Sequence, residues 1–162
     1  MEYKRLYLAY GSNINLEQMA RRCPNSKVIG TAMIPDYELE FRGVATIVPK
    51  KGAQVPVLMW EIDQQDEINL NHYESFPRLY RKEIFEMEVN GKIREGMAYL
   101  MNYKGIAPPT SQYYNGIKKG YEDNGMDTKY LHDALVRSVE YQQSELCESE
   151  EFMEDDFQMS LE

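Results

Sequence analysis

The 162 residues of this chain suffice for one domain with its own hydrophobic core. Apolar residues make up 43% of the chain and charged residues 28%, as in soluble globular proteins, and no apolar run is long enough to span a bilayer. The formal net charge of −9 argues against nucleic acids and anionic membranes as partners. Two cysteines and an N-terminus without the apolar core of a signal peptide predict a cytoplasmic location.

The negative charge is concentrated at the C-terminal end of the sequence. From Glu145 to Glu162 there are eight acidic residues and no basic one, whereas the rest of the chain carries 19 acidic and 18 basic residues. We therefore predict a single domain over residues 1–144 and an acidic tail over residues 145–162. The tail interleaves apolar residues with acids and could pack as an amphipathic segment, but its composition favours a solvated, frayed terminus.

The first third of the sequence reads mainly as β-strands. Residues 6–10 alternate with the period of a strand. A helical spacing then runs from Leu16 to Cys23, where Pro24 ends it. Further strands are expected at residues 37–41, 45–48 and 55–62.

The remaining sequence predicts a short helix, a hairpin and then longer helices. Asp63 is placed to cap a helix over residues 64–73. The dipeptide Asn90-Gly91, between two strand-like runs, is a strong hairpin signal. The strand before it carries Phe85, Met87 and Val89 on one face. The elements expected after the dipeptide are a strand over residues 92–101 and helices over residues 111–124 and 127–143.

These elements predict the α+β class. Five or six mainly antiparallel strands are expected, with helices between and after them. The expected architecture is a small mixed, mainly antiparallel sheet, closed or nearly closed into a β-barrel with α-helices around it.

The inventory of reactive side chains is small. The two histidines, His72 and His132, lie far apart and have no carboxylate or cysteine at metal-ligand spacing, so we favour ordinary packing or surface roles for both. No glycine pattern typical of nucleotide-binding loops occurs. We therefore expect no metal and no cofactor, and an enzyme built on this chain would use carboxylate acid–base chemistry with backbone donors.

Three small residues, Gly11, Ser12 and Asn13, stand between the first strand and the first helix. Such residues let successive backbone N–H groups converge, and a helix N-terminus adds partial positive charge, so the loop suits a carboxylate, a phosphate or an oxyanion. The alternative, favoured by these residues alone, is that Gly11 makes a turn and that Ser12, Asn13 or Asn15 caps a helix.

Four segments of the chain carry a family resemblance. They are YLAYGSN at residues 7–13, YESFPRLYRK at 73–82, AYLM at 98–101 and APPTSQYYNGIKKGYEDNGM at 107–126. In this order they resemble the γ-glutamylcyclotransferase family over roughly residues 5–135, and the Tyr-Gly-Ser-Asn run at the end of the first strand is that family's hallmark.

The resemblance implies a substrate pocket built from these segments, with Glu74 as the catalytic residue. The implied substrate-binding residues are Tyr10, Gly11, Ser12, Asn13, Tyr80, Tyr99 and Tyr113. One residue departs from the family pattern, because the glutamate is usually followed by glycine and here by Ser75. If that glycine takes a positive φ, a serine holds the position less comfortably.

The implied reaction is an intramolecular aminolysis that releases 5-oxoproline and a free amine or amino acid from a small γ-glutamyl substrate. The resemblance also implies a homodimer and a place in glutathione metabolism. Two alternatives stay open: removal of a γ-glutamyl protecting group from a specialised metabolite, and a binding module that uses the same pocket without catalysis. The leaving amine is not identified, because that half of the substrate contacts variable loops.

Overall fold

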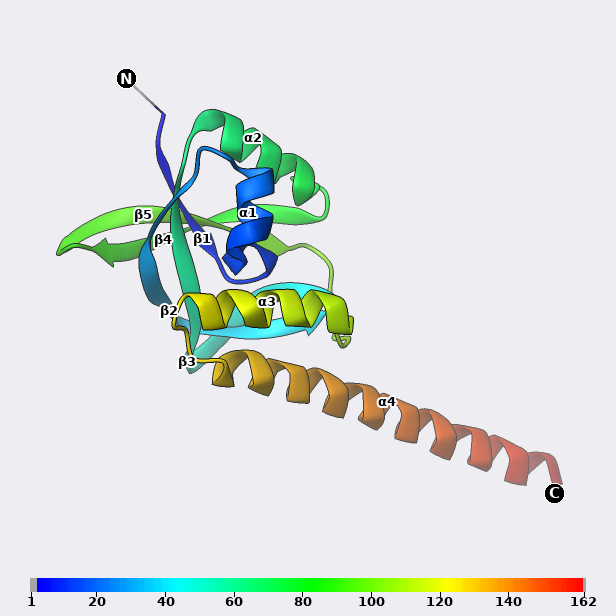
Figure 1. Cartoon of the computed structure of the whole chain (residues 1–162). Helices are drawn as coiled ribbons and strands as arrows, with labels where there is room; N and C mark the ends of the chain where they lie inside the picture. Colours follow the sequence, from blue (N-terminus) through cyan, green and yellow to red (C-terminus); the bar gives the residue numbers. More distant parts are fainter. Residues whose placement is uncertain (1–2, 162) are drawn as a thin grey trace.

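Five strands form one sheet: β1 (Arg5–Ala9), β2 (Lys27–Arg42), β3 (Val44–Ile62), β4 (Tyr80–Val89) and β5 (Lys92–Met101). The computed structural model describes residues 3–161, with side-chain surroundings for residues 3–148. The strand order is β2-β3-β1-β5-β4 (Figure 1), and β1 is antiparallel to β3 and parallel to β5. Together with the helices, the sheet confirms the predicted α+β class.

The central strand β1 is buried. Leu6, Tyr7, Leu8 and Ala9 each belong to the hydrophobic core, and Leu8 is 0% exposed. Neighbouring strands pair with β1 on both sides, so the position of its C-terminal end is fixed by the sheet. The residues that follow β1 therefore leave the sheet at a well-defined point.

Two hairpins complete the sheet. The β4–β5 hairpin forms as predicted, with positive φ at Asn90 and Gly91 in its turn. The strands expected at residues 37–41, 45–48 and 55–62 are parts of the longer β2 and β3, which pair from Arg42↔Val44 to Lys27↔Glu61. The extra length was missed because β2 is an edge strand with many exposed positions and an irregular register near Pro35.

The sheet approaches closure without reaching it. Its edge strands β2 and β4 are not neighbours in the sheet, so the barrel that the sequence predicts is an open sheet in this structure. The two edges meet instead through an edge-to-face contact between the rings of Tyr37 and Phe85, whose centroids are 5.2 Å apart.

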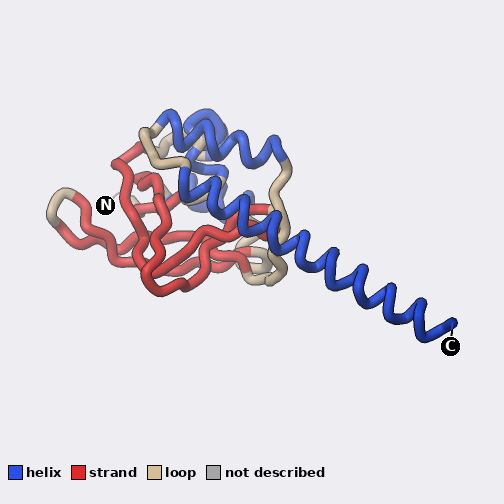
Figure 2. The backbone as a smooth tube through the Cα atoms, turned by 90° about the horizontal axis from the view of Figure 1, so that it is seen from below, coloured by secondary structure: helices blue, strands red, loops and turns tan. Residues whose placement is uncertain are grey.

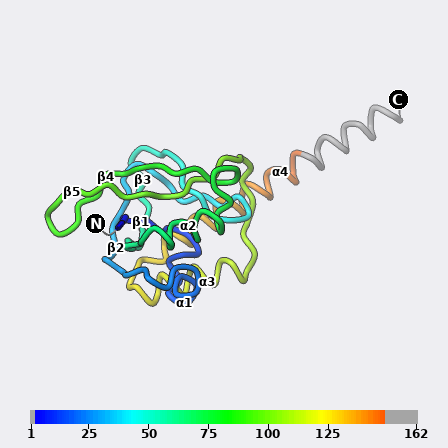
Figure 3. Tube along the Cα trace, turned by 90° about the horizontal axis from the view of Figure 1, so that it is seen from above, coloured from blue at the N-terminus to red at the C-terminus, as the bar shows by residue number. Residues whose placement is uncertain are grey.

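The helices are the 3₁₀ helix η1 (Ser12–Ile14) and the α-helices α1 (Leu16–Arg22), α2 (Gln64–Tyr73), α3 (Ser111–Asp123) and α4 (Lys129–Leu161). Helix α2 has the predicted bounds, and Asp63 forms a capping box with Asp66 at its start. Figure 3 shows α1 and α3 together on one side of the strands, and Figure 2 shows helices along one side of the strands.

Helix α4 is longer than the sequence predicts. It was expected to end near Gln143, but it continues to Leu161, because neither glycine nor proline interrupts it. Its first turns pack on β2, where Arg137 pairs with Glu38, and it then runs away from the sheet (Figure 1). The division into a domain and an acidic tail stays a prediction. Among residues 3–161, no helix combines the length and apolar character needed to cross a membrane.

Helix α3 approaches the chain just after η1 closely enough to restrict one residue to glycine. A Cβ atom on Gly120 would lie 2.7 Å from the Ile14 carbonyl carbon and 2.8 Å from the Asn15 nitrogen. Backbone atoms cannot yield as a flexible side chain can, so Gly120→Ala is expected to lower the free energy of unfolding by about 1–3 kcal/mol, as overpacking does. Urea denaturation followed by far-UV circular dichroism measures this change.

The matched control is Gly116→Ala, one turn earlier in the same helix. There the added Cβ would meet the end of the Gln18 side chain at 3.0 Å, and this side chain can move. Since alanine also has the higher helix propensity, no loss of stability is expected. Equal losses in the two variants would contradict the proposed contact between α3 and the backbone.

Candidate active site

A cavity of about 190 Å³ lies at the C-terminal end of β1. Its wall combines the loop after β1 with the start of β3, the end of α2 and single residues of β4, β5 and α3. All the site residues expected from the resemblance line it: Tyr10, Gly11, Ser12, Asn13, Glu74, Tyr80, Tyr99 and Tyr113. Segments far apart in the sequence thus meet at one place, whereas the role of each residue stays a prediction.

The loop after β1 packs closely against β3 and α3. A Cβ atom on Gly11 would lie 3.4 Å from both the Ala45 Cβ and the Tyr113 hydroxyl. The capping role left open by the sequence belongs to Asn15, whose side chain accepts a hydrogen bond from the Gln18 N–H at 3.0 Å. The side chains of Ser12 and Asn13 are therefore available for other contacts.

Asn13 is buried and bonded through both ends of its amide. Its Nδ2 donates to the Tyr7 hydroxyl at 3.0 Å, and its Oδ1 accepts from the Arg22 guanidinium at 2.6 Å. Its backbone carbonyl accepts from the Trp60 indole N–H at 3.0 Å. These contacts tie the loop to β1, α1 and β3 at once.

Glu74 terminates α2 and carries the carboxyl group of the cavity. Its N–H donates to the Leu70 carbonyl at 2.8 Å, and its side chain lines the cavity. Burial raises the pKa of Glu74 to about 7, while the positive charge of Arg22 acts in the opposite direction. No hydrogen bond from residues 3–148 contributes to this shift, so the carboxyl group is available to a ligand.

The residue after Glu74 adopts the conformation that glycine favours. Ser75 has a φ of 50°, in the left-handed region. The sequence raised this possibility because the family usually has glycine here. A serine in this conformation costs about 1 kcal/mol more than a glycine does.

Tyrosine side chains form much of the remaining wall. Burial raises the pKa of five of them, and the Glu74 charge adds to the effect: Tyr7, Tyr10, Tyr80, Tyr99 and Tyr113. These phenols are therefore neutral near neutral pH, and they act as hydrogen-bonding groups.

The hydrogen bonds of the phenols determine what each can offer to a ligand. Tyr80 donates to the Ala45 carbonyl at 3.0 Å, whereas Tyr113 accepts from the Ala45 N–H at 3.0 Å. Tyr10 donates to the Tyr99 carbonyl. A phenol that already donates can still accept, and one that accepts keeps its own hydrogen for another partner. Tyr113 is therefore placed as a donor and Tyr80 as an acceptor.

Several residues weighed from the sequence lie away from this cavity. His72 and His132 are exposed, and neither lines it. Arg78 and Arg81 are also exposed, and Arg81 pairs with Glu83 at 2.9 Å. Within the described residues, no group of three or more histidine, cysteine or acidic side chains is placed to hold a metal ion.

The sequence did not indicate five of the lining residues, which are Tyr7, Val44, Ala45, Tyr73 and Leu79, nor Arg22 behind the wall. Tyr7 and Tyr73 line the cavity, and the Tyr73 hydroxyl lies 3.0 Å from the Ser12 Oγ. Arg22 contacts both Asn13 and Tyr73 from behind the wall. Adjacency to Glu74 could have indicated Tyr73, but Arg22 is recognisable only once α1 and α2 are placed side by side.

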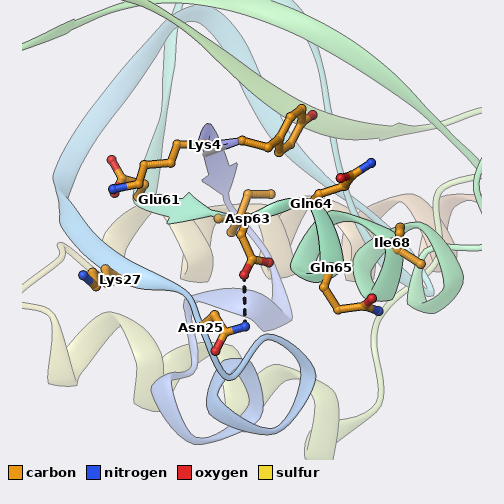
Figure 4. A pocket seen from close by; sticks show the side chains of 10 residues that line it. Lys4, Asn25, Lys27, Glu61, Asp63, Gln64, Gln65 and Ile68 are labelled. Carbon is orange, nitrogen blue, oxygen red and sulfur yellow. Dashed lines mark hydrogen bonds and ion pairs between the residues drawn. The ribbon is translucent and has the colours of Figure 1, made fainter. Parts of the chain in front are cut away.

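A larger depression, of about 530 Å³, lies near the opposite end of β1 (Figure 4). Its wall is largely exposed and polar, and three of its charged groups, Lys4, Glu61 and Asp63, have partners within it. Lys4 pairs with Glu61 at 3.5 Å, and Asn25 donates to Asp63 at 3.0 Å. Its carboxylates, Glu61 and Asp63, already have partners, unlike Glu74, so the smaller cavity is the candidate active site.

Comparisons with known proteins show which family this chain resembles. Residues 7–120, which include the whole cavity wall, match the model of a family described as "Gamma-glutamyl cyclotransferase, AIG2-like". The gamma-glutamylcyclotransferase of Homo sapiens is 29% identical over 142 residues, which cover 77% of this chain and 74% of that protein. The protein of the same name from Bos taurus is 28% identical over 144 residues, which again cover 77% of this chain and 74% of that protein.

A solved structure of a gamma-glutamyl cyclotransferase is also similar to this chain. The TM-score is 0.72 at 26% identity, over 81% of this chain and 86% of the other. The open sheet with its helices is thus the fold of that protein.

The raised pKa of Glu74 makes folding stability depend on pH. Below the ordinary pKa of 4.5 the carboxyl is protonated in the folded and unfolded chain, and its burial carries no charge penalty. As pH rises to about 7, the carboxyl ionises in the unfolded chain before it ionises in the folded chain. The free energy of unfolding therefore decreases over this range. Glu74→Gln is therefore expected to be neutral at about pH 4 and to raise the free energy of unfolding by about 2–3 kcal/mol at about pH 8.

Urea denaturation of both proteins across this range measures the difference. Glu88→Gln, at an exposed position on β4, controls for the loss of a surface carboxylate. A gain in stability that is the same at both pH values would show that the Glu74 carboxyl is not desolvated.

Proposed function

The chain belongs to the gamma-glutamyl cyclotransferase, AIG2-like family, and we propose that it converts a γ-glutamyl compound into 5-oxoproline and a free amine or amino acid. The observation that carries this proposal is the unpaired Glu74 carboxyl, whose pKa is raised to about 7 inside a cavity of neutral donors and acceptors. A carboxyl with such a pKa exchanges protons readily near neutral pH.

The reaction needs one group that first removes and then returns a proton. Glu74 takes a proton from the α-ammonium group of the substrate, and the freed amine attacks the γ-carbonyl carbon. A C–N bond forms and closes the five-membered lactam. Glu74 then gives the proton to the departing nitrogen as the old C–N bond breaks. No water is consumed, and the intramolecular attack lowers the entropic part of the barrier.

The cavity offers separate groups for the two oxygen-bearing parts of the substrate. In this proposal the first N–H groups of η1, in Ser12 and Asn13, hold the α-carboxylate, since the first turn of a helix leaves such donors unpaired. The Tyr113 hydroxyl donates to the γ-carbonyl oxygen as it gains negative charge. The Tyr80 oxygen accepts from the α-ammonium group.

The size of the cavity bears on the substrate class. At about 190 Å³ it is smaller than the sites of about 300–1,000 Å³ that enclose drug-sized ligands. We infer that it encloses the γ-glutamyl part and leaves the amine part at the rim, beside Val44 and Leu79. The homodimer implied by the resemblance, and the cytoplasmic location predicted from the cysteines and the N-terminus, remain part of the proposal.

The proposal is tested by assaying 5-oxoproline release from γ-glutamyl dipeptides, γ-glutamylamines and glutathione. Wild type is expected to release product from at least one of them. Glu74→Gln, nearly equal in size and unable to accept the proton, is expected to lose about 10²–10⁴-fold in kcat, the usual contribution of a general base. The Glu88→Gln variant serves as the control.

The outcomes separate the candidate functions. Turnover by Glu74→Gln at the wild-type rate would exclude Glu74 as the base. Binding of a γ-glutamyl compound without turnover would favour a binding module. Turnover confined to a larger γ-glutamyl conjugate would favour removal of a protecting group.

The role of Tyr113 gives a separate prediction. Tyr113→Phe keeps the ring and removes the donor, so kcat is expected to fall about 10²-fold with a smaller change in KM. Tyr114→Phe is the matched control, because Tyr114 follows in the same helix and packs on Phe41 instead of lining the cavity. A raised KM with unchanged kcat would instead place Tyr113 at the α-carboxylate.

A further inference from the structure

Arg22 holds two sides of the cavity wall without lining the cavity. It is the last residue of α1 and is half-buried. Its guanidinium donates to Asn13 Oδ1 at 2.6 Å, and its Cζ atom lies 3.6 Å from the centroid of the Tyr73 ring. Asn13 and Tyr73 both line the cavity, whereas Arg22 does not.

These contacts close a ring of four residues. The Tyr73 hydroxyl lies 3.0 Å from the Ser12 Oγ, and Ser12 is joined to Asn13 by a peptide bond. Movement of Tyr73 away from the loop would therefore break the contact with Arg22 or the one with Ser12. Since Tyr73 directly precedes Glu74, the ring restrains the carboxyl group relative to the loop after β1.

The backbone of Arg22 is itself anchored to α2. Its carbonyl accepts a hydrogen bond from Asn69 Nδ2 at 3.0 Å. The thiol of the next residue, Cys23, contacts the Asp66 carbonyl at 3.5 Å. The guanidinium thus extends from a fixed point between the two helices.

We propose that Arg22 is a positioning residue of the active site. Through one hydrogen bond and one stacking contact, it fixes the position of the Ser12–Asn13 loop relative to the Tyr73–Glu74 end of α2. Its catalytic consequence rests on the proposed function, but the contacts do not. A guanidinium is planar, so it can donate in its plane while its face covers an aromatic ring. A lysine ammonium keeps the charge but lacks this combination.

The charge of Arg22 also acts on Glu74. It lowers the pKa of Glu74, against the effect of burial, and therefore favours the ionised base. The other titratable groups that line the cavity are phenols: Tyr73 of α2, and Tyr7, Tyr10, Tyr80, Tyr99 and Tyr113. The last five have raised pKa values and stay neutral where Glu74 titrates, so loss of the arginine charge is expected to raise the pKa of Glu74.

The test compares Arg22→Gln and Arg22→Lys with a matched control, Arg21→Gln. Arg21 precedes Arg22 in the same helix end and is exposed, so the control removes an equal charge at the surface. Three quantities are measured in each variant: kcat and KM for 5-oxoproline release, the midpoint of thermal unfolding, and the titration of the Glu74 carboxyl carbon by NMR. The NMR signal is assigned by its absence in Glu74→Gln.

Arg22→Gln is expected to raise the pKa of Glu74 and to lower kcat about tenfold or more, with a smaller change in KM. Arg22→Lys is expected to keep the pKa of Glu74 near the wild-type value and still to lose kcat, because the geometry is lost; misplacement by about 1 Å can cost about 10²-fold in rate. Arg21→Gln is expected to change neither kcat nor the pKa of Glu74.

The proposal is overturned if Arg22→Gln leaves kcat and the Glu74 titration unchanged. It is also overturned if kcat falls only in step with thermal stability while Glu74 titrates as in wild type, since Arg22 would then merely stabilise α1. If no variant and no wild-type protein releases 5-oxoproline, the proposed function fails by itself. The NMR titration then still decides whether Arg22 acts on Glu74.

Discussion

The geometry of the candidate site depends on the buried side chain of Asn13. Its amide can form both hydrogen bonds in only one orientation, with Nδ2 facing the Tyr7 hydroxyl and Oδ1 facing the Arg22 guanidinium. A guanidinium only donates, so the reversed amide would place two donors against each other. The Trp60 indole fixes the backbone of the same residue. A buried polar group left without its partner costs about 1–3 kcal/mol, so the three bonds resist any rotation of the loop. The strand end, the first helix and the loop are therefore set by one residue.

A fixed loop allows the fold to tolerate an unfavourable group opposite it. Glu74 is half-buried without an ion-pair partner in the cavity wall, and Ser75 next to it holds a left-handed backbone conformation. Both features oppose folding, and neither improves the packing of the core. Their persistence beside a cavity is the pattern expected where stability is given up for reactivity. The well-packed sheet around β1 supplies the stability that this arrangement requires.

The sequence predicted best those features that depend on neighbouring residues. The Asp63 cap and the Asn90-Gly91 turn have local causes, and both appear where expected. The length of β2 and the continuation of α4 were missed, since one depends on pairing across a sheet and the other on the absence of a terminating residue. The eight cavity residues that were predicted came from a family resemblance, because periodicity does not indicate which residues line a cavity. Arg22 could not be found in this way, because its role exists only through contacts between α1 and α2.

In the proposed mechanism, the neutral wall and the cation behind it together allow one carboxyl to serve both proton transfers. A cation in the wall itself would stabilise the carboxylate strongly and leave a weak base. A wall without any nearby cation would leave the carboxyl protonated at neutral pH, and no base would be available. Arg22 lies between these limits, since it acts on Glu74 from behind Asn13 and Tyr73, and the pKa settles at about 7. In this proposal, the placement of a single guanidinium outside the cavity adjusts the strength of the base inside it.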